Sequence, residues 1–221
     1  MLKKNINELS LAQVNKVING DCIQEMKTLP DNSIDLIFAD PPYNLQLNET
    51  LYRPDYTAVD AVTDDWDKFK NFQCYDDFTN KWLKECKRLL KPNGCLWVVG
   101  SYHNIYRMGN IIQNLDFWIL NDIIWAKTNP MPNFRGRHFK NDNEKRIWDT
   151  KTKTSRYRFN YDAMKSINGE MQMKSEWTIQ LSSGKERLKD ENGVKLHQTQ
   201  KPEALQHRII LSTEDTTEKM L

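Results

Sequence analysis

One short apolar run constrains the fold more than any other feature of this sequence. Ile34–Ala39 is interrupted only by Asp35 and follows a turn-forming cluster at residues 30–33. Its length and boundaries fit a β-strand that is buried on both faces, as in a parallel sheet. Asp40-Pro41-Pro42-Tyr43 comes directly after it, and open α/β sheets place their ligands at the carboxyl ends of strands. The run therefore predicts both a sheet and the position of a site.

Strand and helix patterns alternate through the first 125 residues. The predicted elements are a strand at 16–19, a helix at 22–27 capped by Asp21, the strand at 34–39, a helix through 78–90 with Asp76 and Asp77 near its start, a strand at 95–99, a helix from Ser101 to about 114, and a strand at 117–125. Residues 44–73 are polar without a clean period, which is typical of a functional loop. The order β-α-β-loop-α-β-α-β predicts an α/β fold with a layered sheet.

The regular alternation of strand and helix patterns ends after residue 128. Residues 129–137 form a loop punctuated by Pro and Gly, 144–148 read as a last short strand, and 150–195 are basic and aromatic without a long helical pattern. Pro202 sits well as the first residue of a further helix. We predict a single domain over residues 1–221, with residues 129–195 as an insertion.

Charge is unevenly distributed along the chain. Residues 1–100 carry 12 basic and 15 acidic side chains, whereas residues 127–165 carry 11 basic and 4 acidic ones. A basic block within a chain of net charge +2 indicates a polyanionic partner. A merely solvated face is the alternative that charge alone leaves open.

Several classes of protein are disfavoured by composition. No window approaches the 18 apolar residues of a membrane span, and no apolar run follows the N-terminal lysines as in a signal peptide. The four cysteines show neither a CxxC pair nor a histidine at zinc spacing, so we expect reduced thiols and no metal. These features predict a cytoplasmic protein.

The residues after the buried run have a chemistry of their own. Two consecutive prolines stiffen the backbone and remove two N–H groups, which leaves nearby carbonyls free to accept from a ligand. Asp40 adds a carboxylate and Tyr43 a flat π-face. Paired acceptors beside a stacking platform suit a planar ligand with an exocyclic amino group. In duplex DNA such a base must be flipped out of the stack before it can react. A proline-rich turn without function is the alternative.

Four blocks, in order, resemble the CcrM-type and HinfI-type adenine-N6 DNA methyltransferases of the β class. They are Asp40 to Leu47, Gly100 to Ile105, Asn129 to Phe134, and His197 to Leu205. The resemblance extends from about Lys16 to Ser212. It implies a Rossmann-like, S-adenosylmethionine-dependent methyltransferase sheet in the circularly permuted β-class order. It also implies duplex DNA as partner, GANTC as target and association with the nucleoid.

The resemblance implies roles for the residues of the proline loop. Asp40 and the Pro41 carbonyl would accept hydrogen bonds from the adenine N6 amino group, with Pro42 keeping the loop rigid. The amino nitrogen would then attack the methyl group of S-adenosylmethionine directly. Tyr43 would stack on the flipped base, and no cysteine nucleophile is expected.

Further residues are assigned by resemblance alone. Asp21 and Cys22 match the block that reads the adenine moiety of the cofactor, although Asp21 also fits a simple helix cap. Lys201 and Pro202 match the block that packs against the methionine end of the cofactor. The residues expected at DNA are Asn44, Arg135, Arg137, Lys140 and Arg158, the last within an aromatic stretch, 157–159. Arginine can read guanine or hold phosphate, and the sequence leaves that choice open.

The pattern departs from the family at its C-terminal end. In β-class enzymes a glycine-rich cofactor loop follows the block at 197–212, whereas no glycine follows Gly193 here. We therefore expect a sheet that is incomplete at the C-terminus, with exposed strand edges and low stability alone. The chain would then aggregate, form a homodimer or need a partner that supplies the missing half. We also expect severely reduced cofactor affinity and doubtful activity. A non-catalytic DNA-binding remnant and a cytosine-N4 methyltransferase are the alternatives, and Asp rather than Ser at position 40 favours adenine.

Overall fold

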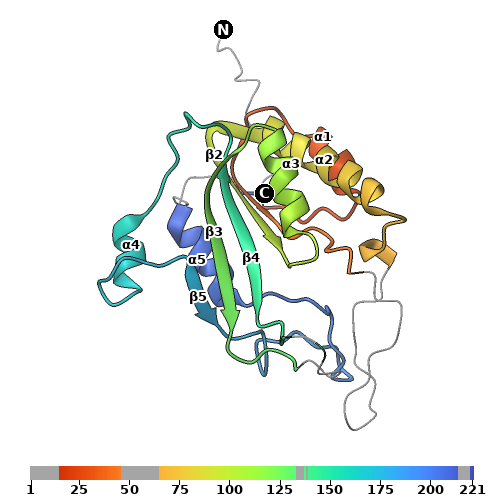
Figure 1. The fold of residues 1–221 in the computed structure, drawn as a ribbon, viewed down its shortest axis with the longest axis vertical. Helices are drawn as coiled ribbons and strands as arrows, with labels where there is room; N and C mark the ends of the chain where they lie inside the picture. The colour runs from red at the N-terminus through yellow and green to blue at the C-terminus, as the bar shows by residue number, and fades with distance from the viewer. Residues whose placement is uncertain (1–14, 46–64, 133–136, 138, 214–219) are drawn as a thin grey trace.

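Five strands form one mixed sheet in the computed structural model, which describes residues 15–45, 65–132, 137, 139–213 and 220–221 (Figure 1). The strands are β1 (Ile34–Ala39), β2 (Leu90–Gly100), β3 (Trp118–Lys127), β4 (Asn143–Thr150) and β5 (Glu176–Ile179), in the order β1-β2-β4-β3-β5. β1 pairs with β2, and β3 with β5, in parallel, whereas β4 runs antiparallel to both β2 and β3. Four of the strands therefore point the same way, and their carboxyl ends share one edge of the sheet.

Helices cover both faces of the sheet (Figure 1). The helices are α1 (Cys22–Lys27), the 3-10 turn η2 (Asp65–Asp67), α2 (Phe72–Leu89), α3 (Ile105–Asn114), α4 (Tyr161–Ser166) and α5 (Glu203–Thr213). One face carries α1, α2 and α3, which bury a largely aliphatic core that includes Leu83, Leu96 and Ile112. We call this the aliphatic face.

The opposite face is rich in tryptophan. α5 packs there through Leu205 and Ile209. The rings of Trp97 and Trp148, on the adjacent strands β2 and β4, stack with centroids 5.2 Å apart and planes 10° apart. Trp125 on β3 is fully buried in the same cluster. We call this the tryptophan face.

The α/β class predicted from the sequence is confirmed, and two elements have the predicted bounds. α1 covers residues 22–27 with Asp21 as its N-cap, whose Oδ1 accepts from the Gln24 amide at 2.9 Å. β1 covers residues 34–39. The strand predicted at 16–19 is wrong: these residues have no regular secondary structure and pair with no described strand, and Val17 is 97% exposed. A strand needs a neighbour for its N–H and C=O groups, and local sequence does not supply one.

Element bounds account for the other corrections. β2 begins at Leu90 rather than at residue 95, directly after α2 ends, and β3 covers residues 118–127 rather than 117–125. α2 begins at Phe72, because Asn71 caps it by accepting from the Cys74 amide at 2.8 Å. Asp76 and Asp77 therefore lie beyond its first turn. Ser101 is not the N-cap of α3, since Asn104 holds that position. Pro202 lies one residue before α5 rather than within it.

The region after residue 128 contributes to the same sheet. The strand predicted at 144–148 is confirmed as β4, but it lies inside the sheet, between β2 and β3. β5, from the segment read as irregular, extends the sheet beside β3 through pairs such as Trp125 with Trp177. None of the described helices is long and apolar enough to cross a membrane.

Candidate active site

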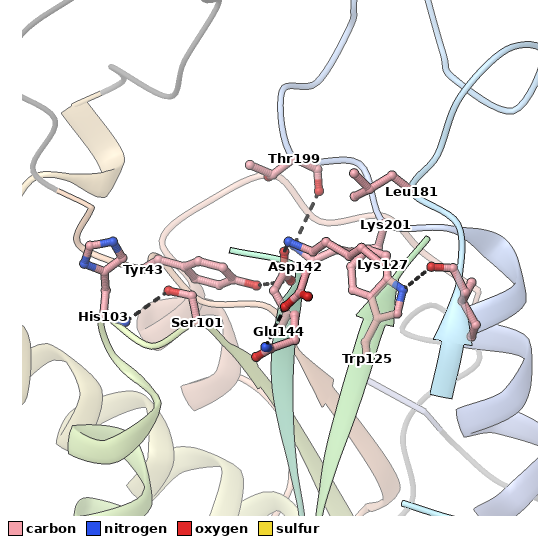
Figure 2. Close-up of polar contacts among 12 residues, drawn as sticks. Tyr43, Ser101, His103, Trp125, Lys127, Asp142, Glu144, Leu181, Thr199 and Lys201 are labelled. Atoms are coloured by element: carbon pink, nitrogen blue, oxygen red, sulfur yellow. Dashed lines mark hydrogen bonds and ion pairs between the residues drawn. The ribbon is translucent and has the colours of Figure 1, made fainter. Parts of the chain in front are cut away.

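The strand ends bring residues from distant parts of the chain to one edge of the sheet. Asp40 follows β1, Lys127 ends β3, and Glu144 lies at the start of the antiparallel β4. Lys201 reaches the same place from the segment before α5 (Figure 2). This is the edge at which α/β sheets bind ligands.

A cavity of about 410 Å³ opens at this edge. Its lining residues are Asp40, Pro41, Pro42, Tyr43, Leu45, Trp66, Asp67, His197, Thr199 and Lys201. The volume lies within the roughly 300–1,000 Å³ of small-molecule sites. The whole Asp40-Pro41-Pro42-Tyr43 loop thus forms one wall, opposite residues of the segment 197–201.

The proline loop is held by contacts on both sides. The Lys201 ammonium lies 2.8 Å from Oδ2 and 3.1 Å from Oδ1 of Asp40. The Tyr75 hydroxyl donates to the Pro42 carbonyl at 3.0 Å. The Pro42 carbonyl is thus bound within the protein. A carboxylate has about four acceptor positions, so Asp40 keeps capacity for a further donor.

Tyr43 connects the loop to the strands behind it. Its hydroxyl lies 3.2 Å from Asp40 Oδ1 and 3.1 Å from Glu144 Oε2, and its single proton serves one of these acceptors at a time. The Lys201 ammonium lies over its ring, 5.1 Å from the centroid. Burial, and then the Asp40 and Glu144 carboxylates, raise the pKa of Tyr43 well above its usual value. The phenol therefore stays protonated at neutral pH and acts as a hydrogen-bond donor.

Glu144 is a carboxylate held in its charged form. It pairs with Lys127 at 2.9 Å, and both side chains are nearly buried (Figure 2). Burial acts to raise the pKa of Glu144, but the Lys201 and Lys127 ammonium groups outweigh it and lower that pKa. The ionised carboxylate is thus a fixed acceptor for the Tyr43 hydroxyl.

A buried cation lies on the same side of β4. Arg146 is 0% exposed, and its guanidinium lies 4.9 Å from the centroid of the Trp125 ring. None of its three nitrogens has a hydrogen-bond partner among the described residues. Burial lowers the pKa of Arg146, whereas Glu144, Tyr43 and Asp40 act to raise it. A desolvated guanidinium is costly, and the aromatic face and nearby carboxylates offset part of that cost.

The structure separates the two predicted cofactor blocks. Lys201 lines the cavity, and buried Pro202 follows it. Asp21 and Cys22 lie at the start of α1 and are absent from the residues that line the cavity. Asp21 uses one carboxylate oxygen as a helix cap, which leaves the other oxygen for a ligand.

The predicted DNA residues are dispersed. Asn44 is 6% exposed, so a direct contact with DNA would require its side chain to reorient. Arg137, Lys140 and Arg158 lie on exposed positions, and Arg135 lies outside the described residues. The aromatic stretch around Arg158 packs partly inward, with the Tyr157 and Phe159 rings 5.3 and 5.6 Å from that of Trp148.

Four further site residues were missed from the sequence, namely Asp67, Lys127, Glu144 and Arg146. The signal for Arg146 was a charged residue within a strand pattern whose neighbours are buried. Asp67 carried no such signal, because its partners lie more than 20 residues away. Among the described residues, no group of three or more His, Cys, Asp or Glu is placed to hold a metal ion.

Comparisons with known proteins agree on one family. The family model described as DNA methylase matches residues 34–219. The type II methyltransferase M.HinfI of Haemophilus influenzae is 52% identical over 221 residues, 100% of this chain and 60% of that protein. The type II methyltransferase M2.DpnII of Streptococcus pneumoniae is 40% identical over 198 residues, 89% of this chain and 72% of that protein. The chain thus spans 60%, less than two thirds, of the length of the first of these relatives.

Solved structures share the fold at low sequence identity. The PvuII DNA methyltransferase, described as cytosine-N4-specific, has a TM-score of 0.66 at 17% identity, over 91% of this chain and 71% of that one. The M1.HpyAVI–SAM complex has a TM-score of 0.59 at 21% identity, over 92% of this chain and 79% of that one. At these identities the likeness concerns the fold alone.

Proposed function

This chain belongs to the DNA methylase family, and from that premise we propose that it is a site-specific DNA methyltransferase acting on the N6 amino group of adenine. The observation that carries the proposal is the loop Asp40-Pro41-Pro42-Tyr43, held at the carboxyl end of β1 in the wall of the cavity. The proposed partner is duplex DNA, and the expected target is GANTC.

Each residue of the loop has its own role in binding and orienting the amino group. Asp40 and the Pro41 carbonyl accept the two N6 hydrogens, which directs the nitrogen lone pair away from them. Tyr75 binds the Pro42 carbonyl, so the loop is fixed before a base arrives. Tyr43 stacks on the flipped base, and Glu144 orients its ring through the hydroxyl. Binding the base in a reactive geometry supplies much of the rate acceleration in such a transfer.

The proposed methyl donor is S-adenosylmethionine, which supplies an electrophilic methyl group when bound. The cavity supports this with its volume, its aromatic Tyr43 and Trp66 side chains, and the Lys201 ammonium, a partner for the carboxylate of the donor. Lys201 is paired with Asp40 in this structure, so it would exchange that partner when the donor binds. Asp21 and Cys22 at the start of α1 remain the proposed contacts for the adenine moiety of the donor.

Target recognition is assigned to residues 129–195. Arg137, Lys140 and Arg158 are exposed in this range, as contacts with phosphate or base edges require. Arg135 is assigned the same role from the sequence. Asn44, in the loop itself, is proposed to meet DNA once a base has entered. β4 and β5 both lie in this range and flank β3 in the main sheet, so recognition and chemistry share one framework.

Transfer of labelled methyl groups tests the proposal. The purified chain is incubated with labelled S-adenosylmethionine and duplex DNA containing GANTC, with Asp40→Ala as the matched control. We expect label in the DNA above the level of the variant. DNA retention without transfer, equal for both proteins, would instead support a DNA-binding protein without catalysis.

A further inference from the structure

Asp67 makes an unusual set of contacts with the proline loop. Its carboxylate accepts three backbone amides in a row: Tyr43 N at 2.6 Å and Asn44 N at 2.8 Å on Oδ1, and Leu45 N at 2.9 Å on Oδ2. The residue is 3% exposed and sits in the short 3-10 turn η2. Three consecutive N–H groups that converge on one anion form the backbone arrangement known as a nest. Here the anion belongs to the protein itself.

The backbone at this point is held in an uncommon conformation. Asn44 has φ of 56°, in the left-handed region that asparagine tolerates better than most residues. Such a conformation costs free energy and persists where surrounding contacts enforce it. The Asp67 carboxylate supplies these contacts on both sides of Asn44. Without it the three amides would be left without acceptors in a buried place, which is costly.

The consequence concerns the orientation of Tyr43. The amide of Tyr43 is fixed by Asp67, and its hydroxyl is fixed by Glu144 and Asp40 on the opposite side of the ring. Pro42, one residue earlier, is fixed by Tyr75. The ring is therefore anchored at both ends, and Asp67 is the anchor on the backbone.

We propose that Asp67 is a positioning residue: its carboxylate preforms the backbone of Tyr43–Leu45 so that Tyr43 and the Pro41 carbonyl meet an incoming base in the reactive geometry. Its effect on turnover rests on the proposed function, whereas its effect on the loop does not. Asp67 also lines the cavity, but both of its carboxylate oxygens are engaged by backbone amides, so it acts through the backbone.

The test uses the full chain and three variants. Asp67→Asn keeps the size of the side chain but replaces one acceptor oxygen by an NH₂ donor that faces an amide. Asp67→Glu keeps both oxygens and adds one methylene. Asp65→Asn is the matched control, because Asp65 lies in the same turn, is fully exposed at its side chain, and pairs only with Lys68 among the described residues.

The first readout is amide hydrogen exchange without DNA. In Asp67→Asn we expect exchange at residues 43–45 to be at least tenfold faster, with β2 unchanged, and in Asp67→Glu an intermediate rate. Asp65→Asn should exchange like the parent chain. Unchanged exchange at residues 43–45, or an equal increase throughout β2, would overturn the proposal. If Asp67→Asn does not fold, the exchange rates of Asp67→Glu at residues 43–45 and in β2 test the proposal by the same criteria.

The second readout is turnover and base flipping. With 2-aminopurine at the target position, Asp67→Asn should lower the fluorescence increase on binding. It should reduce kcat by roughly 100-fold, the penalty of a misplaced reactive group. KM for DNA should change far less than kcat. A parent chain that transfers no methyl group, combined with faster exchange in Asp67→Asn, would contradict the proposed function but support Asp67. Loss of turnover with parental exchange would contradict the role of Asp67.

Discussion

The two faces of the sheet are built from the same strands but from different kinds of side chain. On β4, Ile147 joins the aliphatic core, whereas Trp148, the next residue, stacks on Trp97 on the other face. Glu144 and Arg146 share the tryptophan face, at two-residue spacing from Trp148, and lead to the cavity. The aliphatic face thus contributes mainly to stability, whereas the tryptophan face places charged side chains beside the cavity. Substitutions on the two faces should separate these effects.

The largest expected effect comes from Asp40→Asn at the site. One carboxylate oxygen becomes a donor, so the N6 amino group loses an acceptor and meets an NH₂ group. We expect the methylation rate to fall about 10³-fold, within the range for a group that acts directly on the reacting atoms. The free energy of unfolding should fall by about 1–3 kcal/mol at most, because the nearly buried Lys201 loses its charged partner while asparagine keeps one acceptor oxygen. Single-turnover rates and urea melts measure both, and a large loss of stability would break the division between the faces.

Leu83→Ala tests the aliphatic face. Leu83 is 0% exposed in α2, within the aliphatic core. Truncating a buried leucine costs about 2–5 kcal/mol through lost transfer free energy and the cavity left behind. Urea melts should show that loss, while the methylation rate of the folded protein stays within about threefold, as expected for a site that is not in contact. A rate that falls with stability would mean that the two faces are coupled.

Asp149→Asn tests a polar group on the aliphatic face. Asp149 lies two residues after Ile147 on β4, so its carboxyl group is on the same face of the sheet. It is 0% exposed, neither oxygen has a hydrogen-bond partner among the described residues, and burial raises its pKa well above the usual value. The folded state therefore holds a proton that the unfolded state releases above about pH 4, so this group makes folding less favourable as pH rises. The stability of Asp149→Asn relative to the parent chain should increase between pH 5 and pH 8. A difference independent of pH would show that Asp149 titrates normally.

The smallest expected effect is that of Tyr43→Phe. The ring remains available for stacking, but the hydroxyl contacts with Glu144 and Asp40 are lost. A hydrogen bond of this kind contributes roughly 0.5–1.5 kcal/mol, so the rate should fall about two- to tenfold. Tyr43→Leu should have a larger effect on flipping of 2-aminopurine. Equal effects of the two variants would contradict a stacking role for the ring.

Local sequence patterns predicted part of this structure. α1, β1 and the proline loop were predicted within their bounds, because capping, apolar runs and turn residues act over a few positions. The insertion of β4 between β2 and β3 was not predicted, because sheet order depends on pairing between distant segments. Glu144, Lys127 and Arg146 could not be assigned to the site for that reason. Asp67 was missed likewise, since the loop that it binds lies 22 to 24 residues earlier.

The strand expected at 16–19 also shows that local sequence does not determine strand pairing. Its residues have suitable propensity, yet they find no neighbour among the described strands, and Val17 is 97% exposed. Propensity favours an extended backbone, whereas only pairing makes a strand. Among the described residues, the outer edge of β1 pairs instead with the distant segment at Met220 and Leu221, through an isolated bridge and two backbone hydrogen bonds.

The central claim is that the cavity beside Asp40 transfers a methyl group to an exocyclic amino group of adenine. Enzymatic digestion of the methylated duplex to nucleosides, followed by mass spectrometry, tests it most directly. The predicted result is N6-methyladenine as the labelled nucleoside, absent from the product of Asp40→Ala. Label in N4-methylcytosine would keep the chemistry but contradict the assigned base, and label on a ring carbon, or none above the control, would contradict the account itself.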